Sequence, residues 1–215
     1  MVNNNIFKKT YGAVLMAFIF AIAPTTATFA ANTTSVTQAI NGGVLSADIL
    51  DASRVTVAAP SFAMTATSFS FNCQTSTGTI GSAAQRLYVI NPSGTTAGQS
   101  WTLSIAGSGN WTSGANTYTY NDAIGAGCTN GQLTVNPAVG TIAADCSSTA
   151  CTGAVITKGT STAMTGATPV TLLSAPTGTT IYRGYLTGVS LSQTIPAEKP
   201  SGSYSLPMTI TATAA

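Results

Sequence analysis

The chain has 215 residues, and only 6% of them are charged, against about 25% in an ordinary soluble domain. Residues 1–30 contain two of the seven Lys and Arg residues, so the remaining five are balanced by five Asp and Glu residues. Such a chain has no basic surface to neutralise phosphates, and we expect no nucleic-acid binding. It contains no histidine, which excludes hydrolase triads built on that base.

Residues 1–30 have the order of a secretory signal peptide. Lys8 and Lys9 precede an apolar run at 11–23, which is followed by small, uncharged residues up to Ala30. The run is shorter than the roughly 20 residues that span a bilayer. We therefore expect cleavage after Ala30, a secreted protein with no transmembrane anchor in its mature form, and an N-terminal extension at 31–43.

From residue 44 onward, large side chains alternate with hydroxyl-bearing ones, which is typical of strands with one buried face. The alternation is clearest at 68–73, 100–105 and 203–210. Further strands are predicted at 86–90, 117–120, 132–135, 170–173 and 181–195. Turn-forming residues separate the segments, and Asn130-Gly131 is the strongest hairpin signal among them.

Many short strands separated by turn-forming residues predict an all-β fold, an antiparallel β-sandwich of Ig-like or jelly-roll-like type. We expect a single domain at 44–215, with a Thr-, Ala- and Gly-rich insertion at about 140–168. Residues 48–54 form either a short helix or a polar loop. Pro207 cannot donate to a ladder, so its strand should be an edge strand or carry a bulge.

The four cysteines, Cys73, Cys128, Cys146 and Cys151, indicate two disulfide bonds in an exported chain. Three pairings are possible. We favour Cys146–Cys151, which closes a short loop, together with Cys73–Cys128, a longer staple that contributes about 4 kcal/mol. No CxxC pair and no histidine are present, so we expect no metal site.

We expect neither catalysis nor a cofactor. The sequence has no Gly-rich phosphate loop followed by Lys and Ser or Thr. Asp48 and Asp51 are the only close carboxylate pair, and Arg54 follows them. A surface ion pair or a turn is a simpler interpretation of this segment than a glycosidase pair or a calcium site.

The aromatic residues allow two interpretations. Trp101 alternates in phase with Leu103, which indicates a core position. Trp111, Tyr118 and Tyr120 lie next to turns, where they either pack a hairpin or stack on the sugar rings of a carbohydrate ligand.

The segment LYVINPSGTTAGQSWTLSI at 87–105 resembles the first half of the WxL cell-wall-binding domain of bacterial surface proteins. In that family a strand and a polar turn precede a Gly-x-Trp-x-Leu strand, to which Trp101 and Leu103 correspond. Tyr204 and Leu206 fit a looser form of the motif in the closing hairpin. The resemblance implies a secreted all-β domain that is held non-covalently on peptidoglycan or an associated wall polymer.

The segment IPAEKPSGSYSLPMTITA at 195–212 is also similar to the last strand pair of fimbrial and spore-coat-type subunits, which assemble by strand exchange. That resemblance implies that copies of the chain, or other surface proteins, are its partners. Three hypotheses therefore follow for the cell surface: wall association first, then assembly of a structural subunit, then carbohydrate binding.

Overall fold

The computed structural model describes Gln38 and residues 43–92, 100–125, 128–166, 168–178 and 181–214. The chain divides into two units, Met1–Ile40 and Asn41–Ala215, and the fold given below is that of the second. The expected signal peptide lies outside the described residues, as does most of the expected extension. No helix in the described ranges is long and apolar enough to cross a membrane.

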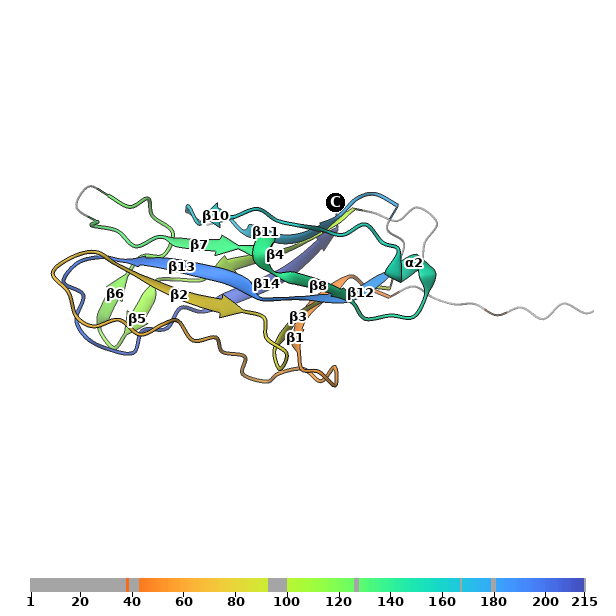
Figure 1. Ribbon diagram of the computed structural model, residues 1–215, viewed down its shortest axis with the longest axis horizontal. Coiled ribbons are helices and arrows are strands. Elements are labelled where there is room, and N and C mark those ends of the chain that lie inside the picture. The colour runs from red at the N-terminus through yellow and green to blue at the C-terminus, as the bar shows by residue number, and fades with distance from the viewer. Residues whose placement is uncertain are drawn as a thin grey trace, which may run out of the picture. The chain divides into compact units, whose positions relative to one another are not determined.

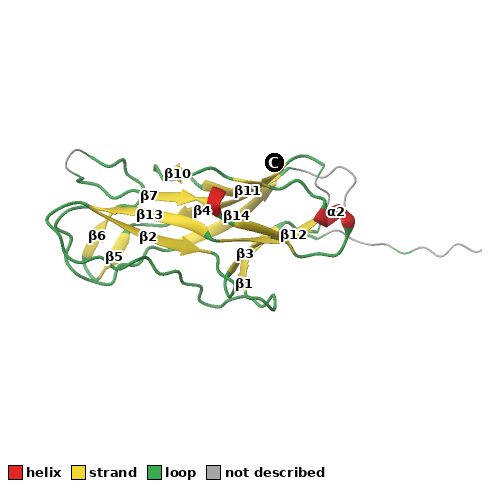
Figure 2. Cartoon of the chain, viewed as in Figure 1, coloured by secondary structure: helices red, strands yellow, loops and turns green. Residues whose placement is uncertain are grey.

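The chain is all-β, as its alternation predicted, and its strands form four antiparallel sheets (Figures 1 and 2). The first sheet has the order β1 (Ser46–Leu50), β3 (Arg86–Asn91), β12 (Tyr182–Thr187), β8 (Thr141–Ala144). The second has the order β10 (Thr162–Ala163), β7 (Leu133–Asn136), β13 (Val189–Ile195), β2 (Gln74–Ile80). The third has the order β14 (Met208–Ala214), β4 (Trp101–Gly107), β11 (Val170–Ala175), β9 (Thr157–Lys158).

The remaining elements are small. The hairpin of β5 (Trp111–Ser113) and β6 (Asn116–Tyr118) is the fourth sheet. A 3-10 turn, η1 (Pro137–Val139), separates β7 from β8, and a single helical turn, α2 (Thr149–Thr152), follows β8. Ser148 begins α2 by accepting the backbone N–H of Cys151 on its hydroxyl, which satisfies a donor that the first turn leaves free.

The first two sheets are joined by strands that run from one into the other. Gly188 lies between β12 and β13 with a φ of +73°, and Gly81 lies between β2 and β3 with a φ of +78°. The backbone N–H of Gly188 donates to the carbonyl of Gly81 over 2.8 Å, so the two bends are bonded to each other. The segment 181–195, predicted as one long strand, is therefore two strands that meet at a left-handed glycine.

The third sheet shares one core with the first two, as in a β-sandwich. Trp101 and Leu103 of β4 are 1% and 0% exposed, and the Trp101 ring stacks on Tyr182 of β12 with 5.7 Å between ring centroids. Full burial of such side chains contributes about 1.5–3 kcal/mol each. Trp101 Nε1 and the Tyr182 hydroxyl are buried without a hydrogen-bond partner in the described part of the chain.

Both favoured disulfides are present. Cys73 and Cys128 have Cα atoms 5.8 Å apart, and Cys146 and Cys151 have Cα atoms 6.3 Å apart, both within the usual range. The first connects the segment before β2 to the loop before β7, and the second closes a loop against β12.

The strand predicted at 68–73 was wrong. These residues precede β2 without joining a sheet, and Phe69 and Phe71 are 51% and 73% exposed. Their rings contact each other edge to face, with centroids 5.0 Å apart. Alternation favours a strand only where a neighbouring strand supplies hydrogen bonds, and the bridge between Met64 and Gly78 already occupies the outer edge of β2.

The segment 140–168, which we expected to be an insertion, contributes strands to the domain. This segment supplies β8, β9 and β10, each of which pairs at the margin of a different sheet. Its Thr, Ala and Gly side chains give little alternation because marginal strands bury few large residues. The Asn130-Gly131 pair lies in a longer loop between β6 and β7, which is closed by a bridge from Asn121 to Gln132.

Two alternatives near the ends of the domain are decided by the structure. Residues 46–50 form β1, and the Asp51 side chain then accepts the backbone N–H groups of Ser53 and Val55, so residues 48–50 belong to a strand and only 51–54 form a polar loop. In the described part of the chain β14 pairs only with β4, as Pro207 predicted for an edge strand. β14 begins at Met208, so Tyr204 and Leu206 precede it rather than forming part of it.

Candidate functional site

Three segments meet beside the β5–β6 hairpin: the residues that enter β2, those that leave β13, and those that lead to β14 (Figure 1). Thr112 of β5 and Ser205 exchange backbone hydrogen bonds of 3.0 and 2.9 Å, which attaches the hairpin to the segment before β14. Glu198 donates its backbone N–H to the Ser70 carbonyl over 2.9 Å. These bonds bring together residues that are distant in the sequence.

Three aromatic side chains, Trp111, Tyr118 and Tyr204, pack in a row that we call the aromatic cluster. Trp111 and Tyr118 face each other across the hairpin and stack with centroids 6.0 Å apart, and Tyr204 lies 5.1 Å from Tyr118. Burial raises the pKa of Tyr118 to about 12. The Tyr204 hydroxyl donates to the carbonyl of Pro200 over 2.9 Å, which fixes this ring above the loop.

A buried glutamine of β13 orients the aromatic cluster through Trp111. Gln193 of β13 is fully buried, and its Oε1 accepts the indole N–H of Trp111 over 2.8 Å. Its Nε2 donates to the carbonyl of Thr194 over 2.7 Å. Because both ends of the amide are satisfied, Gln193 connects the cluster to the second sheet without leaving an orphaned polar atom.

A pocket of about 110 Å³ opens beside the cluster, and we call it the end pocket. Its wall combines aromatic side chains, residues that carry hydroxyl, amide or ammonium groups, and a few aliphatic residues. Its lining residues are Thr67, Ser68, Phe69, Ser70, Asn72, Gln74, Tyr118, Ile195, Pro196, Lys199, Pro200, Ser201, Gly202 and Tyr204.

One wall of the end pocket, residues 67–74, is fixed by covalent and polar links. Cys73 is bonded to Cys128, and the Gln74 amide donates to the Ser68 carbonyl over 2.8 Å. The Asn72 backbone N–H bonds the Ser70 hydroxyl over 2.9 Å. This wall is therefore held in place although only Gln74, its last residue, belongs to a sheet.

The predicted site residues divide into two groups. Trp111, Tyr118 and Tyr204 come together in the aromatic cluster. The others pack inward: Trp101 and Leu103 are core residues, Tyr120 is buried with its hydroxyl on the Gly107 carbonyl, and Leu206 is half-buried against the core. Trp101 and Leu103, which correspond to the WxL motif in β4, therefore cannot contact a ligand directly in this fold.

Sequence reasoning missed three residues of the site: Phe69, Gln193 and Lys199. Phe69 was assigned to a strand because of its alternation, and Gln193 looked like an ordinary polar position in β13. Lys199 carried one usable signal, because it is one of only five basic residues after residue 30 and lies in a Pro-rich turn.

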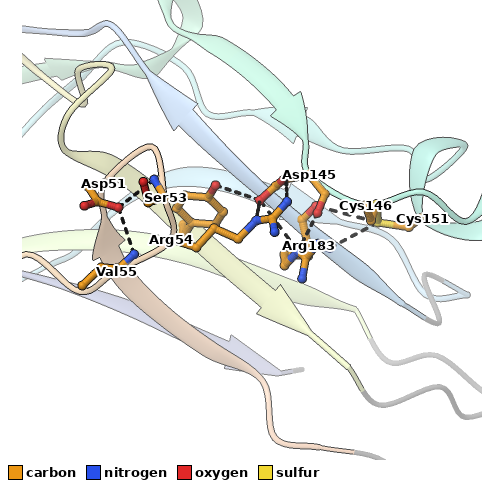
Figure 3. Close-up of polar contacts among 9 residues, drawn as sticks. Asp51, Ser53, Arg54, Val55, Asp145, Cys146, Cys151 and Arg183 are labelled. Atoms are coloured by element: carbon orange, nitrogen blue, oxygen red, sulfur yellow. Dashed lines mark hydrogen bonds and ion pairs between the residues drawn. A yellow bond between two sulfur atoms is a disulfide. The ribbon is translucent and has the colours of Figure 1, made fainter.

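A second polar cluster lies at the Cys146–Cys151 loop (Figure 3). Asp145 receives two hydrogen bonds from the Arg54 guanidinium, at 2.6 and 2.7 Å, and a third from the Tyr88 hydroxyl at 2.8 Å. Arg183 donates to the Asp145 carbonyl, and its own backbone N–H contacts Cys151 Sγ. These groups satisfy one another, which indicates a structural clamp between the β1–β3 region and the loop after β8.

The clamp shifts the titration of its members. Hydrogen bonds from Arg54 lower the pKa of Asp145 to about 2, with smaller contributions from Tyr88 and Arg183. Burial, followed by the bond to Asp145, raises the pKa of Tyr88. The described residues contain no group of three His, Cys, Asp or Glu side chains placed to hold a metal ion.

Comparison with family models, with curated proteins and with solved structures finds no match to this chain. Its proposed role therefore depends on its own residues.

Proposed function

We propose that the protein is an exported, non-catalytic cell-surface protein that associates non-covalently with the bacterial cell wall. The observation that carries the proposal is the end pocket with its aromatic cluster, in which Phe69 and Tyr204 lie beside hydroxyl and amide groups. Pockets with aromatic walls and a few placed polar groups are typical of ligand sites.

The scaffold supports this proposal. Two disulfides are compatible with an extracellular protein, and the chain has neither histidine nor a phosphate-loop motif. Two of its five basic residues after residue 30 are used structurally, since Arg54 and Arg183 both contact Asp145. A surface of this kind recognises a partner by shape, stacking and hydrogen bonds.

Co-sedimentation with purified cell walls tests the proposal. The exported protein, with its disulfides intact, is expected to pellet with walls and to remain in the supernatant without them. Pelleting that persists at moderate salt is expected, because stacking and neutral hydrogen bonds are screened little by ions. Protein that stays in the supernatant at all salt concentrations would contradict wall association.

A second candidate function, assembly of a structural subunit, is favoured by β14. This seven-residue edge strand contains no charged residue, and exposed Thr209, Thr211 and Thr213 alternate with half-buried side chains. Edge strands are usually protected by charge, so an uncharged one is suited to pairing with another strand. Light scattering of the exported protein at high concentration distinguishes this candidate, because an assembling subunit forms multimers.

A further inference from the structure

We propose that the end pocket binds one anionic pyranose unit, such as a uronic acid residue, of a surface polysaccharide. The inference deepens the proposed wall association, on which it rests, by naming the class of ligand. Four properties of the pocket carry it: its rings, its polar groups, its single charge and its size.

The rings match the apolar face of a sugar. Tyr204 is half-buried and Phe69 is 51% exposed, so both rings combine an accessible face with a fixed position. Tyr118, which stacks on Trp111, also lines the pocket and is 8% exposed. A pyranose ring presents C–H groups on one face and hydroxyls around its edge, and aromatic side chains complement such an amphipathic shape.

The polar lining matches the hydroxyl edge of a sugar. The lining residues include four that carry hydroxyls, Thr67, Ser68, Ser70 and Ser201, and Asn72, which carries an amide. Each hydroxyl or amide both donates and accepts, as does each hydroxyl of a saccharide. An apolar peptide side chain would leave these groups without partners, which costs binding free energy.

The charge selects an anion. Lys199 is the only charged residue among the lining residues, and its ammonium reaches the carbonyl of Thr117 only at 3.5 Å. Glu198, the adjacent carboxylate, is exposed and does not line the pocket. An ammonium group has three donors, so Lys199 retains donors for a carboxylate on the ligand.

The size limits the ligand to one ring. Pockets that enclose drug-sized molecules have volumes of about 300–1,000 Å³. The end pocket, at about 110 Å³, is too small for a nucleotide cofactor and is suited to a single sugar unit of a longer chain.

Nuclear magnetic resonance titration of the exported protein tests the inference, with digalacturonic acid as the anionic probe and galactobiose as the neutral one. We expect saturable shifts at residues 67–74 and 195–204 with the anionic probe. Lys199→Gln should weaken its binding roughly two- to fivefold, the usual range for an exposed ion pair, whereas Lys199→Arg should retain it. Tyr204→Ala should abolish saturable binding of both probes.

Each other outcome counts against the inference. Equal affinity for the neutral probe would overturn its anionic part, and inorganic phosphate that competes equally well would show an adventitious anion site. Shifts outside the two segments, or none, would overturn the inference entirely. Wall pelleting without saccharide binding would refute this pocket assignment alone, whereas saccharide binding without pelleting would refute wall association alone.

Discussion

Arg54 and Asp145, 91 positions apart in sequence, form a two-point ion pair with donor–acceptor distances of 2.6 and 2.7 Å. Arg54 adopts a φ of +66°, a left-handed conformation that is uncommon for a residue with a side chain. The turn at 51–55 holds this conformation through the Asp51 carboxylate. The pair therefore connects the turn after β1 to the loop after β8.

This pair predicts a specific acid sensitivity. Because the pKa of Asp145 is lowered from 3.8 to about 2, its contribution to stability is complete above about pH 4 and is lost as the pH falls through about 2. Asp145→Asn should lower the free energy of unfolding by about 1 kcal/mol at neutral pH, since Arg54 is half exposed. The variant should also lose less stability than the wild type between pH 4 and 2.

Denaturant unfolding across this pH range measures both effects. Asp122→Asn is the control, because Asp122 lies outside the clamp. An unchanged pH dependence in Asp145→Asn would contradict the assigned role of the clamp.

Gly81 and Gly188, which are hydrogen-bonded where the strands bend, predict that a side chain at Gly81 destabilises the fold. A Cβ on Gly81 would lie 2.9 Å from both the Leu186 carbonyl oxygen and the Thr187 Cα, in addition to its positive φ. Gly81→Ala should therefore destabilise the fold by more than the roughly 1–2 kcal/mol of the left-handed conformation alone.

Gly109→Ala is the matched control, because Gly109 has a φ of +81° and an added Cβ would have no neighbour within 4 Å among the described residues. Thermal unfolding of the two variants separates backbone strain from steric contact. Equal losses of stability would mean that the close approach at the bend is unimportant.

The two disulfides should contribute unequally. Loop entropy gives about 4 kcal/mol for Cys73–Cys128, with a sequence separation of 55, and about 2 kcal/mol for Cys146–Cys151, with a separation of 5. Replacement of each pair by serine, followed by denaturant unfolding, measures the difference. Only loss of Cys73–Cys128 should increase hydrogen exchange at residues 67–74; the opposite pattern would mean that this wall of the end pocket is held by other contacts.

The β14 edge allows a matched test of assembly. Thr211, Ser104 and Thr171 lie in one row across β14, β4 and β11. If the edge pairs with another copy, Thr211→Lys should abolish multimers, because a charge on an edge strand opposes pairing. Thr171→Lys places the same charge on an interior strand and should leave them intact. Light scattering of both variants decides the point, and multimers that survive Thr211→Lys would exclude this edge.

The sequence predicted the core more fully than the site. Trp101, Leu103 and Ile105 alternate because each must face one side of β4, so burial imposes a pattern that can be read without a structure. Phe69 lies in a segment with the same alternation, but that segment joins no sheet and Phe69 remains exposed. Gln193 lies in β13 and Lys199 in the turn after it. Their place in the site depends on contacts with segments distant in sequence, which no local sequence pattern predicts.

We propose that the accessible aromatic side of the end pocket, rather than the buried Trp101, binds the cell wall. Wall co-sedimentation of Phe69→Ser/Phe71→Ser, which removes a ring that lines the pocket and the exposed ring packed against it, tests this directly. Val55→Ser/Val155→Ser is the control, because it removes two similarly exposed apolar side chains elsewhere. We predict that the phenylalanine variant stays in the supernatant while the valine variant pellets like the wild type. Undiminished pelleting of the phenylalanine variant, with its fold intact by circular dichroism, would contradict the claim.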